Sequence, residues 1–233
     1  MSTIYLVPCT LADDALATIP PYVLDAVKQC SVIFAENERT ARRYLKSLDK
    51  SIVIDDFEWF TIHKAEAEQI QQFRQKINEQ KNIAIISEAG CPGIADPGQV
   101  LIGVAQQMHC LVKPLVGPSS ILLALMASGM NGQQFEFVGY LPIDNIERSK
   151  RIKELEAASQ KNNSTKIFIE TPYRNNQMME ALIKNCGNPT KVCVAVNITA
   201  ATESIRTLSV ADWKNKNPEL HKQQAIFLLY AGK

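Results

Sequence analysis

Residues 85–98 read IISEAGCPGIADPG, and this stretch leaves an apolar strand and enters a helix. Its three glycines allow the backbone to approach a ligand closely, whereas its two prolines stiffen the loop. It has neither the Gly-Lys-Ser/Thr ending of a P-loop nor the Gly-x-Gly-x-x-Gly dinucleotide fingerprint. We therefore expect a glycine-rich cradle whose carboxylate, Asp96, suits hydroxyls or a cationic centre better than phosphates. The alternative is a strand-to-helix turn in which Asp96 caps the following helix.

A second loop, residues 116–120, reads VGPSS and separates another apolar run from a helix that opens at Ile121. Ser119 or Ser120 can cap that helix, and its free N–H groups would also attract a ligand carboxylate. Capping alone is the simpler interpretation. Because both loops follow strands of one predicted sheet, we expect them to face the same crevice and a small ligand with a polar head and a ring or ribose.

Strand-like apolar runs alternate with amphipathic segments of helical length along the 233 residues. This alternation predicts an α/β fold with largely parallel pairing. The formal charge changes from −3 over residues 1–116 to +4 over residues 117–233, a mild asymmetry along a plausible domain boundary. The length leaves one large domain or two smaller ones open. We expect strands at residues 4–8, 31–35, 83–87, 111–115, 167–170, 191–196 and 225–230, helices near 21–29, 39–47, 65–80, 98–108 and 176–185, a solvated helix at 149–158 and a loop at 160–165.

The composition excludes several classes of protein. With 46% hydrophobic and 21% charged residues, the chain is an ordinary globular one, and no apolar run approaches the roughly 20 residues that span a bilayer. The first residues lack the features of a signal peptide, so we expect a cytoplasmic protein with no membrane partner. A net charge of +1 means that any nucleic-acid contact must come from a local patch.

Metal binding and a disulfide framework are not expected. His63, His109 and His221 are scattered without the spacing of metal ligands. The six cysteines have no C-x-x-C spacing, and we interpret them as small buried hydrophobic residues.

Two basic clusters are candidates for contact with RNA phosphates. Arg39, Arg42, Arg43 and Lys46 recur at helical spacing, which predicts one stripe on a helix. The other cluster lies on the predicted solvated helix, where three glutamates dilute it, and comprises Arg148, Lys150, Arg151 and Lys153. For both clusters a solvated helix face is the alternative.

Four stretches resemble motifs of the tetrapyrrole-methylase-like S-adenosylmethionine (SAM) methyltransferases, within the branch that 2′-O-methylates a cytidine of small-subunit ribosomal RNA. Residues 85–98 are similar to V-S-D-A-G-T-P-G-I-S-D-P-G, nearly position for position. Residues 116–120 are similar to P-G-P-S-A, residues 135–142 (FEFVGYLP) to F-x-F-x-G-F-L-P, and residues 169–174 (IETPYR) to Y-E-S-P-H-R. The matches occur in family order and span most of the chain.

The resemblance implies two α/β domains, a mainly parallel sheet in the first, SAM as cofactor in a cleft between the domains, and a homodimer. It also implies a set of cofactor-binding residues, namely Ala89, Gly90, Gly93, Ile94, Asp96, Gly117, Pro118, Ser119 and Ser120.

Three other segments depart from the branch. Residues 7–14 read VPCTLADD where the branch has T-P-I-G-N-L-G-D, and residues 36–42 read ENERTAR where it has E-D-T-R-H-T-R. Residues 195–200 read AVNITA in place of A-R-E-L-T-K. The cofactor loops are thus retained better than the substrate loops, and we predict the cofactor more firmly than the substrate.

Methyl transfer from a sulfonium is an in-line displacement, for which the protein must align the reacting atoms and exclude water. A ribose hydroxyl would also need a base, and Glu36, Glu88 and Glu170 are the candidates by their positions near strand ends. A helix cap or a salt-bridge partner is the alternative for each, and Glu170 is preferred because it lies with Arg174 in a matched motif. Arg39, Arg42 and Arg174 are the candidates for binding an RNA substrate. Two other functions stay open: methylation of a tetrapyrrole or another small molecule, and SAM binding without turnover.

Overall fold

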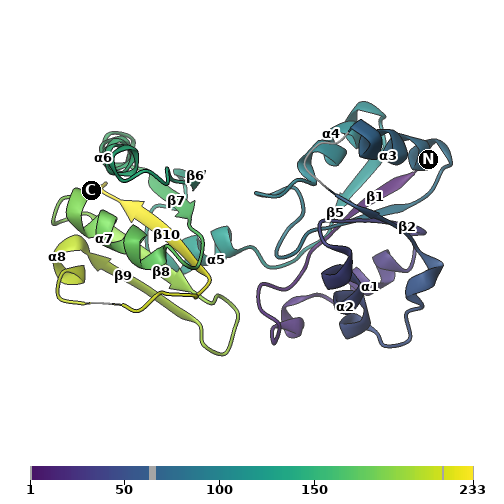
Figure 1. Cartoon of the computed structure of the whole chain (residues 1–233), viewed down its shortest axis with the longest axis horizontal. Coiled ribbons are helices and arrows are strands. Elements are labelled where there is room, and N and C mark those ends of the chain that lie inside the picture. Colours follow the sequence, from purple (N-terminus) through teal and green to yellow (C-terminus); the bar gives the residue numbers. More distant parts are fainter. Residues whose placement is uncertain (1, 63–66, 217, 233) are drawn as a thin grey trace. The chain divides into compact units, whose positions relative to one another are not determined.

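The computed structural model describes residues 2–62, 67–216 and 218–232. The chain divides into two compact units, Met1–Ser119 and Ser120–Lys233 (Figure 1). Each unit contains one five-stranded sheet with helices packed on it. No helix in the described part of the chain is both long and apolar enough to cross a membrane.

The sheet of the first unit is entirely parallel, with the strand order β3-β2-β4-β1-β5. This confirms the predicted mainly parallel first sheet. The strands are β1 (Thr3–Val7), β2 (Val32–Ala35), β3 (Glu58–Thr61), β4 (Ile83–Ile86) and β5 (Leu111–Pro114). The sequence did not indicate β3, because this short edge strand is only partly buried and mixes polar with aromatic residues.

Helices cover both faces of this sheet, so the central strands β2 and β4 are buried on both sides. Ile33 and Ala35 pack toward one face and Val32 and Phe34 toward the other, as the alternation along a strand requires. Figure 1 shows α1 (Tyr22–Val27) and α2 (Glu38–Leu48) on one side of the sheet, and α3 (Ala67–Asn78) and α4 (Gln99–Gln107) on the other. Two short 3-10 turns complete the unit, at Leu16–Thr18 and Ile54–Asp56.

The second unit has a mixed sheet with the order β6-β7-β10-β8-β9. Only β6 and β7 pair in parallel, and the other three pairings are antiparallel. Largely parallel pairing is therefore wrong for this half of the chain, because β10 runs antiparallel to both β7 and β8, and β8 and β9 form a hairpin through the loop at 197–203. The elements are α5 (Ser120–Ser128), β6 (Phe135–Tyr140), α6 (Asn145–Asn162), β7 (Thr165–Ile169), α7 (Asn175–Asn185), β8 (Lys191–Val196), β9 (Ser204–Ser209), α8 (Val210–Trp213) and β10 (Ala225–Tyr230).

Helix α6 is longer than predicted and less solvated. Asp144 begins it by accepting hydrogen bonds from the N–H groups of Ile146 and Glu147, and Asn163 ends it in the left-handed conformation. The predicted loop at 160–165 is wrong, since α6 continues to Asn162 and β7 begins at Thr165. Arg148 is buried against the Ile143 carbonyl and Asn145, so it cannot belong to an exposed basic cluster.

Candidate cofactor site and active site

The carboxyl ends of the five parallel strands place their following loops at one edge of the first sheet. The loops after β1 and β4 are joined there by a small antiparallel bridge. The N–H of Cys9 donates to the carbonyl of Gly90 at 2.8 Å, and the N–H of Gly90 donates back to the carbonyl of Cys9 at 3.2 Å. Gly90 has a φ of +70°, which a glycine adopts without strain.

The loop after β5 packs directly on this bridge. A Cβ added to Gly117 would lie 2.1 Å from the Cβ of Pro8, so only glycine lets these two loops approach so closely. The thiol of Cys91 donates to the carbonyl oxygen of Pro118 at 3.5 Å, and the loop after β4 thereby contacts the loop after β5. Three loops thus form one assembly, which we call the loop cradle: residues 8–11, 88–98 and 116–119.

Asp96 organises the longest of these loops. Its carboxylate accepts hydrogen bonds from the N–H of Gly93 at 2.9 and 3.0 Å and from the N–H of Gly98 at 2.7 Å. Gly93 has a φ of +83°, and a Cβ there would lie 2.6 Å from Ile102. The side chain of Ile94 is exposed at the tip. Asp96 therefore holds the loop in shape, while a direct contact between Asp96 and the cofactor remains a prediction.

Two more carboxylates lie at the loop cradle, Glu36 beside it and Glu88 within it. Glu36 follows β2, and its Oε2 accepts the N–H of Glu88 at 3.0 Å. Asn37 donates to Oε1 of Glu88 at 2.9 Å while it caps α2. Burial raises the pKa of Glu36, and the negative charges of Asp96 and Glu88 raise it further against the lowering effect of the Glu88 N–H.

Burial also raises the pKa of Asp96, even though the N–H groups of Gly93 and Gly98 oppose this shift. The pKa of the Cys9 thiol rises to about 12, through burial and the nearby charge of Glu36. Negative charges therefore accumulate at this edge, where a positively charged ligand would be stabilised. The residues fit SAM, whose sulfonium is a cation and whose ribose supplies hydroxyls.

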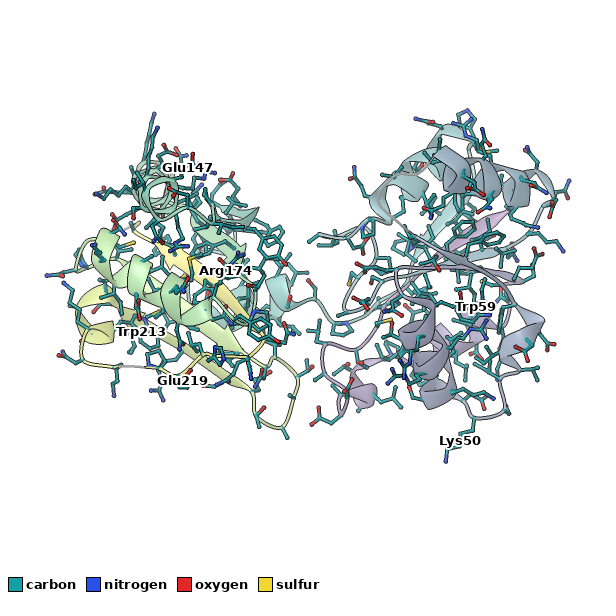
Figure 2. The ribbon with its side chains drawn as sticks, in the orientation of Figure 1. Lys50, Trp59, Glu147, Arg174, Trp213 and Glu219 are labelled. Atoms are coloured by element: carbon teal, nitrogen blue, oxygen red, sulfur yellow. The ribbon has the colours of Figure 1, made fainter. Side chains whose placement is uncertain are left out.

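The arginines of α2 differ in their availability. Arg42 is held by Glu38 at 2.6 Å and by Asp55 at 3.7 Å, and its guanidinium lies 4.8 Å from the centre of the Trp59 ring, which Figure 2 labels. Arg39 and Arg43 are exposed and make no side-chain hydrogen bond or ion pair with the described residues. A shallow depression of about 610 Å³ lies between them and is lined by Glu38, Arg39, Arg42 and Arg43.

In the second unit, Glu170 and Arg174 form a pair at the end of β7. The Glu170 side chain is fully buried, and its Oε1 accepts hydrogen bonds from the N–H of Thr171 at 2.7 Å and from Nε and Nη2 of Arg174 at 3.0 and 2.6 Å. Its Oε2 has no partner within the described part of the chain. The side chain of Arg174, which Figure 2 labels, is one-quarter exposed.

Two asparagines at the same edge were not predicted. Asn175 is completely buried and donates to the carbonyl of Gln223 at 2.7 Å. Asn197 follows β8 with a φ of +48° and accepts the N–H of Gln224 at 3.2 Å. No pattern of charges in the sequence marks these two asparagines, so only their tertiary contacts identify them.

The predicted site residues thus fall in two groups. Glu36, Arg39, Arg42 and the cradle residues from Ala89 to Ser119 belong to the first unit, whereas Ser120, Glu170 and Arg174 belong to the second. The described residues contain no group of three side chains able to hold a metal ion, and His63 lies outside them.

A family model of the tetrapyrrole (corrin/porphyrin) methylases matches residues 3–213. The fold is accordingly that of a SAM-dependent methyltransferase. The chain belongs to the tetrapyrrole (corrin/porphyrin) methylase family.

Relatives and solved structures agree with this assignment. Ribosomal RNA small subunit methyltransferase I of Vibrio cholerae is 27% identical over 97% of this chain and 76% of its own length. The protein of the same name from Bacillus subtilis is 30% identical over 93% of this chain and 72% of its own length. Uroporphyrin-III C-methyl transferase from Thermus thermophilus, solved with S-adenyl homocysteine, shares the fold with a TM-score of 0.59 at 12% identity, over 98% of this chain and 97% of its own.

Proposed function

We propose that this protein methylates a ribose 2′-hydroxyl of small-subunit ribosomal RNA with SAM as the methyl donor. The observation that carries the proposal is the stretch at residues 85–98. It resembles the signature of the ribosomal RNA branch, and it forms the longest part of the loop cradle. Relatives named for this RNA, which align over nearly the whole chain, support the same substrate.

The loop cradle would hold the cofactor. Its backbone is fixed by the Cys9–Gly90 bridge and by Asp96, so a bound ligand would meet groups that need little reorganisation. SAM supplies an electrophilic methyl group on a cationic sulfur. The nearby carboxylates of Glu36, Glu88 and Asp96 would attract that charge and the ribose hydroxyls.

Glu36 is our choice for the base. A ribose hydroxyl is a weak nucleophile, and a base works best when its pKa approaches the working pH. The pKa of Glu36 is shifted upward, toward that range, by burial and by two neighbouring carboxylates. Glu170 is placed differently, since one of its oxygens is used by Arg174 and Thr171. We assign Glu170 the role of positioning Arg174, which would contact an RNA phosphate.

Arg39 and Arg43 would bind RNA on the first unit. Both are exposed cations without partners in the described structure, and they flank the depression on α2. Arg42 contributes less, because Glu38, Asp55 and the Trp59 ring already hold its guanidinium. Phosphate contacts of this kind would position the RNA without reading its sequence.

The proposal includes a homodimer, which rests on the resemblance to the family, and a cytoplasmic location, which is in line with ribosomal RNA as the substrate. Light scattering at micromolar protein concentration tests the first, and a mass of one chain would refute it. Fractionation of the source cells tests the second, and recovery outside the cytoplasm would refute it.

The deciding experiment is transfer of a labelled methyl group. The substrate would be small-subunit particles and naked ribosomal RNA from cells that lack this methylation, with a small-molecule extract assayed in parallel. We expect label on a 2′-oxygen of the small-subunit RNA, detected as a nucleotide that resists alkaline cleavage. Label in the small-molecule fraction alone would instead support tetrapyrrole or other small-molecule methylation. SAM binding without label in any fraction would support a protein without turnover.

A further inference from the structure

A cavity of about 360 Å³ lies in the second unit, and neither Glu170 nor Arg174 lines it. Its apolar wall includes Val194 on β8, Trp213 on α8 and Leu220, which all belong to the buried core of this unit. Pockets of this size bind small molecules or single groups of a larger ligand. Trp213 and Glu219, which both line it, are labelled in Figure 2.

Two cations border the cavity. Arg206 lies on the edge strand β9 opposite Val194 on β8, so both side chains share the face that the cavity occupies. Lys216 follows α8. Both side chains are exposed, and neither has a hydrogen-bond or ion-pair partner within residues 2–62, 67–216 and 218–232. The acidic lining residue, Glu219, is already hydrogen-bonded by Asn176 at 2.9 Å and by the N–H of His221 at 2.8 Å.

The wall formed by residues 218–223 is fastened to the rest of the unit. Asn176 accepts the N–H of Leu220 at 2.8 Å, and the buried Asn175 donates to the carbonyl of Gln223 at 2.7 Å. The N–H of Lys222 donates to the carbonyl of Pro172 at 3.0 Å. The cavity therefore has fixed sides.

An exposed aromatic pair adjoins this wall. The rings of Tyr173 and His221 meet edge to face with 5.9 Å between their centroids, and Tyr173 is 67% exposed. Tyr173 directly precedes Arg174 in the chain. Exposed aromatic rings next to cations are typical of surfaces that bind unpaired nucleotides.

We propose that this cavity binds one unstacked nucleotide of the RNA substrate, with its base against the wall of Val194, Trp213 and Leu220 and its phosphates on Arg206 and Lys216. The proposal rests on the proposed function and adds a further RNA contact to those at Arg174 and on α2. Two unpaired cations over an apolar wall match a phosphate joined to a base. The charge of +4 over residues 117–233 favours the same polyanion.

The test measures binding of a short fluorescein-labelled single-stranded RNA of mixed sequence by anisotropy at several salt concentrations. The test variant is Arg206→Gln/Lys216→Gln. The control variant is Lys161→Gln/Lys184→Gln, which removes the same charge from exposed positions on α6 and α7 outside the cavity. All four side chains are exposed, so both variants should unfold at the urea concentration of the parent protein.

For a single strand, each lost phosphate contact should reduce the magnitude of the slope of log K against log salt by about 0.7. The slope of the test variant should therefore be smaller in magnitude than that of the parent protein by about 1.4. We expect its KM for small-subunit RNA to rise about tenfold with kcat unchanged, the pattern of lost ground-state binding. SAM affinity should stay unchanged, and the control variant should resemble the parent protein in all three measurements.

Equal salt slopes for the test and control variants would overturn the proposal. The proposal would also be overturned if the two substitutions weakened the binding of an acidic peptide but left RNA binding unchanged, because the occupant of the cavity would then be a protein. Failure of the parent protein to methylate ribosomal RNA would refute the proposed function alone. The salt slope would still decide whether the cavity binds an RNA nucleotide.

Discussion

Replacement of Gly117 by alanine tests whether close packing of two loops builds the cofactor site. The new Cβ would lie 2.1 Å from the Cβ and 2.5 Å from the Cγ of Pro8, whereas ordinary contact begins at 3.4 Å. The ring of Pro8 is rigid and cannot rotate away, so the backbone of one loop must move. Overpacking of this kind costs about 1–3 kcal/mol.

The assay is urea denaturation, with calorimetric titration of SAM on the folded protein. We expect Gly117→Ala to lower the free energy of unfolding by about 2 kcal/mol and to weaken SAM binding, because the displaced loop also carries the carbonyl that Cys91 contacts. Gly103→Ala is the matched control. It lies within α4, where an added Cβ meets no atom within 4 Å, and it should stabilise the protein by about 0.5–1 kcal/mol.

A double-mutant cycle with Pro8→Gly separates the collision from other effects. Pro8→Gly removes the atoms that the new methyl group would strike, so Gly117→Ala should cost much less in that background. Unchanged stability and SAM affinity in Gly117→Ala would refute the packing argument. An equal cost of Gly117→Ala with and without Pro8 would place its cause elsewhere.

Three further outcomes are expected. Arg174→Ala should lower the free energy of unfolding by about 2–3 kcal/mol, because it leaves the buried Glu170 carboxylate without its cation. In urea denaturation, the double variant Arg174→Ala/Glu170→Gln should recover part of this loss. No recovery would contradict the pairing of these two side chains. The affinity for SAM should fall as the pH is lowered through the raised pKa of Glu36, because protonation removes a negative charge from the cationic ligand's site. Glu36→Gln should flatten this pH dependence in calorimetry, and an unchanged profile would exclude Glu36. SAM should protect the partly exposed Cys91 from alkylation but not the partly exposed Cys110, as read by mass spectrometry; equal protection would argue against a cofactor beside Cys91.

Much of the first unit was predictable from local patterns. Its central strands are continuous apolar runs because helices bury both faces, and such runs are visible in a sequence. The edge strands β3, β6 and β9 were missed because exposure gives them mixed polarity. The antiparallel pairings of β10 were missed because strand direction depends on where the chain returns, and composition does not record that.

Within the candidate site, the sequence indicated the residues but not their tasks. Asp96 stood out as a carboxylate between glycines that could meet a ligand, yet its hydrogen bonds to Gly93 and Gly98 form within the loop. The glycine at 117 was predicted to face a ligand, and the structure adds that it packs against Pro8, more than a hundred residues away in the chain. Arg148 was counted among surface cations, although the bonds to Ile143 and Asn145 bury it.

The sequence by itself determined the alternation of strands and helices, the parallel first sheet and the motifs of the cofactor loops. These depend on periodicity and on residue types that lie close together in the chain, so local order is sufficient to encode them. Only the tertiary structure decided that Glu36 shares an edge with Asp96 and Glu88, and that Arg206 and Lys216 stand over one cavity. Burial, charge coupling and cavities arise from contacts between distant segments, and such contacts exist only once the chain has folded.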